Sequence, residues 1–311
     1  MDALSSVLSL LKPQNSLAAG LEAGGDWSIR FPDLTGGIKT GAIISGQCWL
    51  EVEGSPGPIR LDQGDCFLLP HGRPFRLASD LSLDPVDAGD AFRPVTPGGM
   101  IRLNGGDGFS MISTRFILSG SQSGFLLGML PAIVHVRSAP EQDVLLWSIR
   151  RIMTELRGPQ AGGTLAVDHL AHLMLIEALR LHLAAEAEAR IGWLFALADD
   201  RVSQALHAIH SAPTERWTVE SLASRAGMSR SSFAARFRAL VGTSPMDYLI
   251  RWRMAVAGER LATGREPISA IALSVGYESE ASFSTAFKRI MGAAPRRYAR
   301  TVDRGVTRSA P

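Results

Sequence analysis

The alternation of apolar and polar positions divides the chain into three successive regions. Between residues 27 and 77, short apolar stretches are separated by Gly, Pro and Asp turns, a pattern typical of an all-β sandwich or barrel. From residue 145 onward the apolar spacing is helical. This order predicts an α+β multidomain protein with a β-rich N-terminal domain and an all-α C-terminal domain. The predicted strands are residues 41–46, 48–54, 59–61, 66–70, 111–118 and 124–127.

Two helices are expected between these domains. The first, at residues 145–156, places its apolar residues on one face. The second, at residues 168–184, is apolar around most of its circumference, so it must be covered on most sides. It is either a wholly internal helix or part of a contact with a second subunit, and we favour dimerisation. Residues 139–194 are therefore predicted to form a helical dimerisation or linker region.

An internal repeat dominates the C-terminal region. Five residues recur with matching chemical type after 50 positions, and two residues upstream of them recur after 49. One structural unit is therefore expected to occur twice. The pairs are Phe233/Phe283, Phe237/Phe287, Gly242/Gly292, Pro245/Pro295, Tyr248/Tyr298, Ala223/Ala272 and Gly227/Gly276.

Each copy has the order of a helix-turn-helix unit. A short helix, which Thr218 can cap in the first copy and Pro267 can start in the second, ends at a glycine. Ser229 or Ser279 can cap the next helix, whose two phenylalanines lie one turn apart. A helix from Pro245 of about 18 residues would span about 27 Å between the copies. This length suits two recognition helices in successive major grooves about 34 Å apart.

The distribution of charge indicates that the C-terminal half is basic and binds a partner. From residue 196 onward there are 17 Arg and Lys against 10 Asp and Glu, whereas before it there are 15 against 20. This asymmetry fits one half that meets a polyanion. No apolar run is long enough for a membrane span, and the first residues lack a secretory signal, so a cytoplasmic protein is expected. Cys48 and Cys66 are expected to be buried reduced thiols.

The stretch from Trp217 to Arg300 resembles the DNA-binding domain of the AraC/XylS family of regulators, with its signature in the second copy around Gly276, Phe283 and Phe287. The resemblance implies a DNA-binding domain at residues 195–304, followed by a flexible tail at 305–311. It also implies double-stranded DNA as a partner, with RNA polymerase as a further candidate.

The outward positions of the second helix in each copy are the predicted DNA contacts. Arg230, Ser231 and Thr285 are the best candidates to read base edges. The family often has arginine where Ala235 and Thr285 stand here, so arginine readout is absent at those two positions. The full predicted set is Ser229, Arg230, Ser231, Ser232, Ala235 and Arg238 in the first copy, Ser279, Glu280, Ala281, Ser282, Thr285, Lys288 and Arg289 in the second, and Arg296 and Arg297 on phosphates.

The N-terminal part, residues 1–138, resembles the cupin-like barrel found ahead of such DNA-binding domains. The resemblance lies in Gly46-x-Cys48-Trp49 and in Gly64-Asp65 followed by Pro70-His71-Gly72. The metal ligands of cupin enzymes are missing: Lys39-Thr40-Gly41 lacks a His-x-His pair, and Phe75 stands where a histidine is expected. We therefore predict no metal, no cofactor and no catalysis. Five aromatic residues either line an effector pocket or simply form the core: Trp27, Phe31, Trp49, Phe67 and Phe75.

Together these features predict a sequence-specific DNA-binding transcription regulator that acts as a homodimer and responds to a small-molecule effector. One alternative is a cupin-type metal-dependent enzyme with an accessory DNA-binding domain. Another is a regulator that needs no ligand and uses its barrel as an interaction module. Activation and repression of transcription are equally compatible with the sequence.

Overall fold

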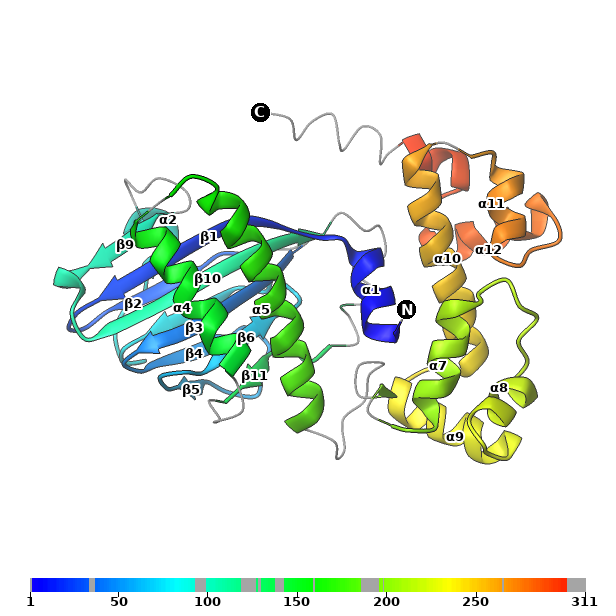
Figure 1. The fold of residues 1–311 in the computed structure, drawn as a ribbon, viewed down its shortest axis with the longest axis horizontal. Coiled ribbons are helices and arrows are strands. Elements are labelled where there is room, and N and C mark those ends of the chain that lie inside the picture. The colour runs from blue at the N-terminus through cyan, green and yellow to red at the C-terminus, as the bar shows by residue number, and fades with distance from the viewer. Residues whose placement is uncertain are drawn as a thin grey trace. The chain divides into compact units, whose positions relative to one another are not determined.

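The computed structural model describes residues 2–33, 37–92, 99–118, 127, 130–137, 143–158, 160–185, 196–197, 199–264 and 266–300. They form two compact units (Figure 1). The helical unit contains Met1–Lys12 and Glu186–Pro311, and the β unit contains Pro13–Ser119 and Leu130–Ala185. The domain boundaries predicted after residues 138, 194 and 304 lie outside the described residues. Within the described part, no helix combines the length and apolarity that a membrane span requires.

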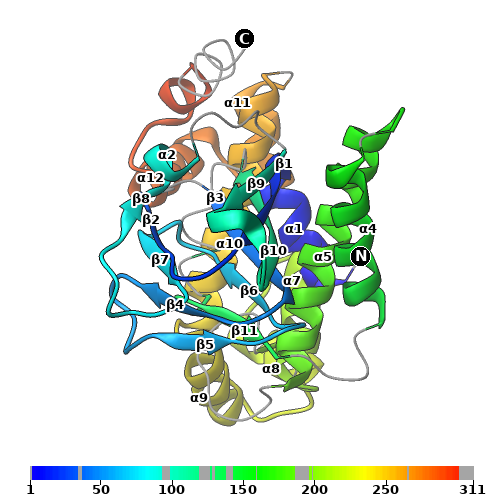
Figure 2. The same cartoon turned by 90° about the vertical axis from the view of Figure 1, so that its left-hand side faces the viewer.

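The β unit is a sandwich of two sheets, seen in Figures 1 and 2. The strands predicted between residues 41 and 70 and at 111–118 are confirmed as β3, β4, β5, β6 and β10, whereas the one predicted at 124–127 lies almost wholly outside the described residues. One sheet has the order β11(Val134–Val136), β6(Cys66–Leu69), β3(Gly37–Ser45), β10(Phe109–Leu118), β1(Pro13–Ala23) and β9(Met100–Leu103). The other has the order β5(Ile59–Leu61), β4(Cys48–Val52), β7(Phe75–Ala78), β2(Ser28–Phe31) and β8(Val86–Asp87).

The core of the β unit lies between the two sheets. Because side chains alternate along a strand, each strand sends every second residue inward. Ile43 and Phe67 from the six-stranded sheet pack in one cluster with Leu50 and Leu77 from the five-stranded sheet. The connections include the short helix α2(Ala88–Ala91) and a 3-10 turn, η1(Asn104–Gly106).

Two helices cover the outer face of the six-stranded sheet. They are α4(Asp143–Arg157) and α5(Gly163–Ala185), and both predicted helices are therefore confirmed (Figure 1). Phe116 of β10 is fully buried there and meets the ring of His172 of α5. Val144 and Trp147, one turn apart on α4, are exposed instead. The helix pair thus has one face against the sheet and apolar side chains on its solvent side.

The helical unit contains α1(Ala3–Leu11), α7(Val202–Ser211), α8(Val219–Arg225), α9(Arg230–Val241), α10(Pro245–Thr263), α11(Ile268–Ser274) and α12(Glu280–Met291). The first helix differs from the predicted domain scheme, which assigned it to the N-terminal domain. Its Val7 and Leu11 are buried, α1 contacts α7 and α10, and Lys12 forms an ion pair with Glu259 of α10. An apolar helix face that packs on α7 and α10 explains why α1 belongs to this unit.

A buried histidine links α7 to α10 in the core of the helical unit. The ring of His210 stacks on Trp252 at 3.7 Å between ring centroids, and its Nε2 lies 2.8 Å from the Tyr248 hydroxyl. Burial disfavours the charged imidazolium and lowers the pKa of His210 to about 3, with a smaller contribution from His207. The ring is therefore neutral in the folded protein at neutral pH.

This depressed pKa predicts a loss of stability in mild acid. The unfolded chain takes up a proton at His210 near pH 6.5, whereas the folded chain does so only near pH 3, so the free energy of unfolding falls as the pH drops below about 6.5. Between pH 7 and pH 5 the histidine should account for about 2 kcal/mol of this fall. Urea unfolding of the helical unit within the full chain should show a smaller decrease for His210→Gln. His207→Gln is the matched control, because His207 is exposed on the same helix; equal pH slopes for the two variants would contradict the prediction.

Candidate nucleic-acid interface

The first half of the repeat folds as a helix-turn-helix unit. Thr218 caps α8, and its side chain and that of Ser221 form a reciprocal capping box. Gly227, in the turn, has a φ of +60°, which a residue with a side chain rarely adopts. Ser229 then caps α9 by accepting a hydrogen bond from the Ser232 amide. The caps and the turn predicted from the sequence are confirmed.

The second half repeats this construction. Pro267 is the N-cap of α11, Gly276 has a φ of +81° in the turn, and Ser279 caps α12 through the Ser282 amide. The turn is packed more tightly than the first one. A Cβ atom at Gly276 would lie 2.8 Å from a guanidinium nitrogen of Arg253 and 2.9 Å from the carbonyl oxygen of Thr214. The turn of the second unit is therefore held against the segment that precedes the first unit and against α10.

Aromatic contacts place both second helices in the same way. Phe233 and Phe237 of α9 lie 5.6 Å apart, and Phe283 and Phe287 of α12 lie 5.4 Å apart between ring centroids. The second ring of each pair meets a tyrosine edge-on: Phe237 meets Tyr248 at 5.8 Å, and Phe287 meets Tyr298 at 5.3 Å. The sequence repeat is thus a repeat of packing geometry. Between the two units runs α10, whose 19 residues correspond to about 28 Å.

The opposite faces of α9 and α12 carry most of the predicted DNA contacts on exposed positions. In α9 these are Arg230, Ser231, Ser232, Ala235 and Arg238, and in α12 they are Glu280, Ala281, Ser282, Thr285, Lys288 and Arg289, with the capping Ser229 and Ser279 and the later Arg296 and Arg297 also exposed. No ion pair within the described residues engages Arg230, Arg238, Lys288, Arg289 or Arg296. The hydroxyl of Thr285 donates to the Ala281 carbonyl oxygen, so it meets a partner mainly as an acceptor. These helices therefore present cations and hydroxyl groups to the outside.

Arg236, which precedes Phe237 on α9, has a structural role. Its Nε donates a hydrogen bond of 2.8 Å to Asp199, which also caps the start of α7 through the Val202 amide. Burial opposes ionisation of Asp199, but the hydrogen bonds from Arg236 and Val202 outweigh it and lower the pKa of the carboxyl group. Arg236 thus fixes α9 to α7 and leaves the outward face of α9 to its neighbours.

Comparison with known proteins identifies the family. The profile of a family described as "Cupin" matches residues 2–184, and one described as "Helix-turn-helix domain" matches residues 222–301. A "Putative AraC-like transcription regulator" of Streptomyces antibioticus is 43% identical over 299 residues, which cover 96% of this chain and 98% of the relative. The chain belongs to the AraC-like transcription regulators. The family predicted from the sequence is confirmed, and with it a DNA-binding function.

Other relatives match most of this chain or about a third of it. The "HTH-type transcriptional regulator AlkR" of Acinetobacter baylyi is 29% identical over 305 residues, covering 96% of this regulator and 99% of the relative. The crystal structure of the DNA-binding domain of AdpA in complex with a target DNA is 32% identical. It covers 33% of this chain and 92% of that domain, with a TM-score of 0.31.

The residue types that bind metals are dispersed in the cupin-like unit, apart from the contact between His135 and Asp65. Within the described residues, no three His, Cys, Asp or Glu side chains gather in a group that could hold a metal ion. The ring of His71 is half-buried, and its Nε2 lies 3.1 Å from the carbonyl oxygen of Leu130. Cys48 and Cys66 are buried free thiols, as predicted, and burial raises the pKa of Cys48 to about 12. Both thiols are therefore protonated at neutral pH.

Of the five aromatic residues predicted to line a pocket, four belong to one core cluster or pack against it, and Trp49 does not. Trp27 packs on Phe109 in the buried core, and Phe67 is buried in the same cluster. Trp49 is half-buried between the inward-facing Cys48 and Leu50, so strand alternation turns it toward the outer face of its sheet. Only Phe31 and Phe75 stack on each other, at 4.4 Å and 5°. Trp27, Phe31, Phe67 and Phe75 thus contribute to the core between the sheets, and the effector pocket remains a prediction.

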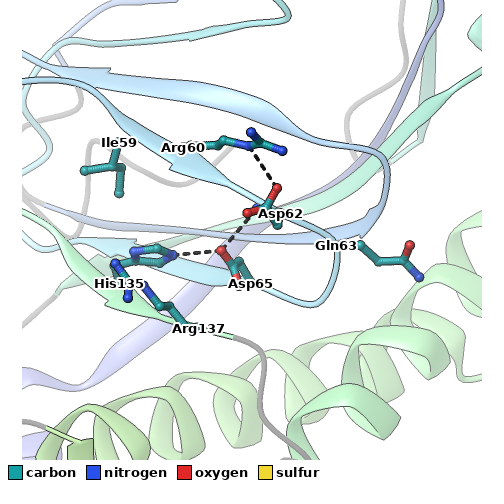
Figure 3. A pocket seen from close by; sticks show the side chains of 7 residues that line it. All are labelled: Ile59, Arg60, Asp62, Gln63, Asp65, His135 and Arg137. Carbon is teal, nitrogen blue, oxygen red and sulfur yellow. Dashed lines mark hydrogen bonds and ion pairs between the residues drawn. The ribbon is translucent and has the colours of Figure 1, made fainter.

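A surface pocket of about 520 Å³ lies elsewhere on the β unit (Figure 3). Its charges pair with one another: Arg60 Nε donates to Asp62 at 3.0 Å, and His135 Nε2 donates to Asp65 at 2.9 Å. Asp65 also accepts from the Asp62 amide and is buried, so it organises the Gly64-Asp65 turn. The pocket is lined by Ile59, Arg60, Asp62, Gln63, Asp65, His135 and Arg137. Arg60 and His135 are thus each held by a carboxylate of the same pocket.

Sequence reasoning missed a second polar cluster, which lies between the sheets. Lys39 is buried on β3, and the residue paired with it on β10 is Arg115. The sequence contained one signal for this cluster: Lys39, one of only three lysines in the chain, lies in the apolar stretch between Ile38 and Ile43. The register that brings Arg115 beside Lys39 is a property of the sheet, which a single sequence does not display.

The two turn glycines of the helix-turn-helix units predict unequal costs of substitution. Gly227→Ala has open space around its new Cβ and should cost about 1 kcal/mol, the penalty for a left-handed residue with a side chain. Gly276→Ala carries the same penalty and also clashes with Arg253 and the Thr214 backbone, so it should cost at least about 1 kcal/mol more. Urea unfolding of the two variants measures the difference directly. Equal midpoints would mean that the second turn relaxes without resistance.

Proposed function

We propose that this AraC-like regulator binds specific DNA sites as a homodimer and that a small-molecule effector bound by the β unit changes its occupancy of those sites. The observation that carries the proposal is the pair of equivalent helices α9 and α12, whose outward faces carry cations that form no ion pair within the described part of the chain. Joined through α10, they suit two successive major grooves on one side of a duplex. The amides at the starts of α9 and α12 support phosphate contacts.

Within this proposal the base-edge contacts are made by Arg230, Ser231 and Thr285. Arg230 stands at the first position of α9, next to the cap, where a recognition helix points its start at the bases. Arg238, Lys288, Arg289, Arg296 and Arg297 contact phosphates and supply affinity that depends on salt. Because Ala235 and Thr285 have short side chains, the longest base-reading side chain in this set is Arg230 at the start of α9.

Footprinting on the DNA that adjoins the regulator's own gene tests the proposal. Arg230→Ala should weaken binding at the protected site by about 5- to 150-fold, corresponding to about 1–3 kcal/mol, and should relax the base preference at one position. Arg201→Ala is the matched control, since Arg201 is exposed on the same unit but lies at the start of α7. Absence of any protected site at low salt would refute the function, whereas an unchanged footprint for Arg230→Ala would remove only this residue from the interface.

The dimer contact is proposed to lie on α4 and α5. Trp147 is 57% exposed, Val144 is 49% exposed beside it, and Leu165 of α5 is 62% exposed. Val144 and Trp147 lie one turn apart on α4, and neighbouring exposed apolar side chains support a protein contact more strongly than scattered ones. This extends the predicted dimerisation from the helix at residues 168–184 to the helix that precedes it.

Sedimentation analysis of the full chain tests this contact. Trp147→Asp should shift the protein from dimer toward monomer, because a carboxylate would have to be buried in the apolar contact. Val86→Asp is the matched control, since Val86 is also about half exposed but lies on β8 of the other sheet. If Trp147→Asp sediments as the wild type does, the dimer contact lies elsewhere.

A further inference from the structure

The inner face of β10 becomes more exposed toward one end of the sandwich. Along this face Met111 is fully buried, Ser113 and Arg115 are half-buried, and Ile117 is 47% exposed. On the opposite face of the same strand, Ile112, Thr114 and Phe116 are all fully buried. The sandwich is therefore closed at the Met111 end and open to solvent between its sheets at the Ile117 end.

Hydrogen-bond donors gather just inside this opening. Lys39 of β3 lies opposite Arg115 of β10 in the strand register. Ser113 lies two residues before Arg115 and therefore on the same face of β10. Within the described residues, the Ser113 hydroxyl is buried without a hydrogen-bond partner. The Lys39 ammonium makes no hydrogen bond or ion pair there, and its nearest partner is the ring of Phe31, 6.0 Å away. The second cation, Arg115, adds repulsion.

This arrangement is costly for the fold. Lys39 is only 9% exposed, and a buried cation without a counter-charge is rarely tolerated. Burial, together with the charge of Arg115, lowers the pKa of Lys39 to about 8, so the ammonium stays charged at neutral pH. The aromatic stack of Phe31 and Phe75, with Phe92 at 5.8 Å from Phe31, lies on the other sheet and offers an apolar wall. A ligand with a negative charge and an apolar body would neutralise the cations on one sheet and pack against the aromatic rings on the other.

We propose that the open end of the sandwich binds a small organic oxyanion, held by Lys39, Ser113 and Arg115, with its apolar body against Phe31 and Phe75. The inference deepens the proposed function, because it names the chemical class of the effector. Charge-assisted hydrogen bonds from an ammonium and a guanidinium suit a carboxylate or a phosphate alike. In the surface pocket of Figure 3, by contrast, Arg60 forms an ion pair with Asp62, whereas Lys39 forms none within the described residues.

Calorimetric titration of the full chain tests the proposal with three ligands that share one apolar body: octanoate, octyl phosphate and neutral 1-octanol. At least one of the two anions should bind, and more tightly than 1-octanol. Lys39→Met, which keeps the length of the side chain and removes its charge, should weaken binding of that anion at least tenfold and leave 1-octanol unchanged. The same variant should unfold at a higher temperature without ligand, because a buried unpaired charge is gone; this result also shows that it folds.

Arg30→Met is the matched control, since Arg30 lies on β2 beside Phe31 but is exposed. It should bind the anion as the wild type does. The proposal is overturned if neither anion binds, if 1-octanol binds equally well, or if Lys39→Met retains the anion. Footprinting on the same samples separates the two proposals. A wild-type protein that protects DNA but binds no anion refutes only the ligand class, whereas anion binding without any protected DNA site refutes only the DNA-binding proposal.

Discussion

The edge-on contact between a phenylalanine and a tyrosine one helix later is the constraint on which the DNA-binding unit depends. Phe237 meets Tyr248 at the start of α10, and Phe287 meets Tyr298 in the second copy. Each contact fixes the rotation of a second helix about its own axis. That rotation decides which residues face outward, so the same rings that form the core also determine the DNA-facing surface. Tyr248 further anchors this core by its hydrogen bond to His210.

The two units bury polar groups in opposite ways. In the helical unit, His210 loses its charge, meets a hydroxyl group and stacks on Trp252, so its burial is compatible with stability at neutral pH. In the β unit, Lys39 keeps its charge beside Arg115. A neutral, hydrogen-bonded side chain such as that of His210 is compatible with a structural core. The charged Lys39 is not, because an apolar side chain of the same length would make the folded protein more stable.

The features that were predictable from the sequence are those set by local chemistry. Caps, turn glycines and the repeated aromatic residues specify the helix-turn-helix units within short windows, and the structure reproduces them. Strand β1 escaped detection, since Pro13–Ala23 contains small and polar residues of low strand preference. It is stabilised by pairing with β10 on one side and β9 on the other. Helix α1 also depends on distant partners, because its burial results from contacts with α7 and α10, about two hundred residues away.

The candidate ligand site illustrates why side-chain patterns alone do not reveal a binding region. Aromatic residues are the usual signal, yet Trp27 directly precedes β2 and Phe31 ends it, about 13 Å apart at the usual rise per residue. Within the described residues, the end with Phe31 combines an apolar wall and solvent access with the buried Lys39 ammonium and Ser113 hydroxyl, neither of which has a hydrogen-bond partner there. A ligand there would contact β10, which pairs along most of its length with β1, and β1 follows directly after α1 of the helical unit. Any effect on DNA affinity must arise from a difference in ligand binding between two arrangements of the protein, and this covalent connection is one route by which the two could differ.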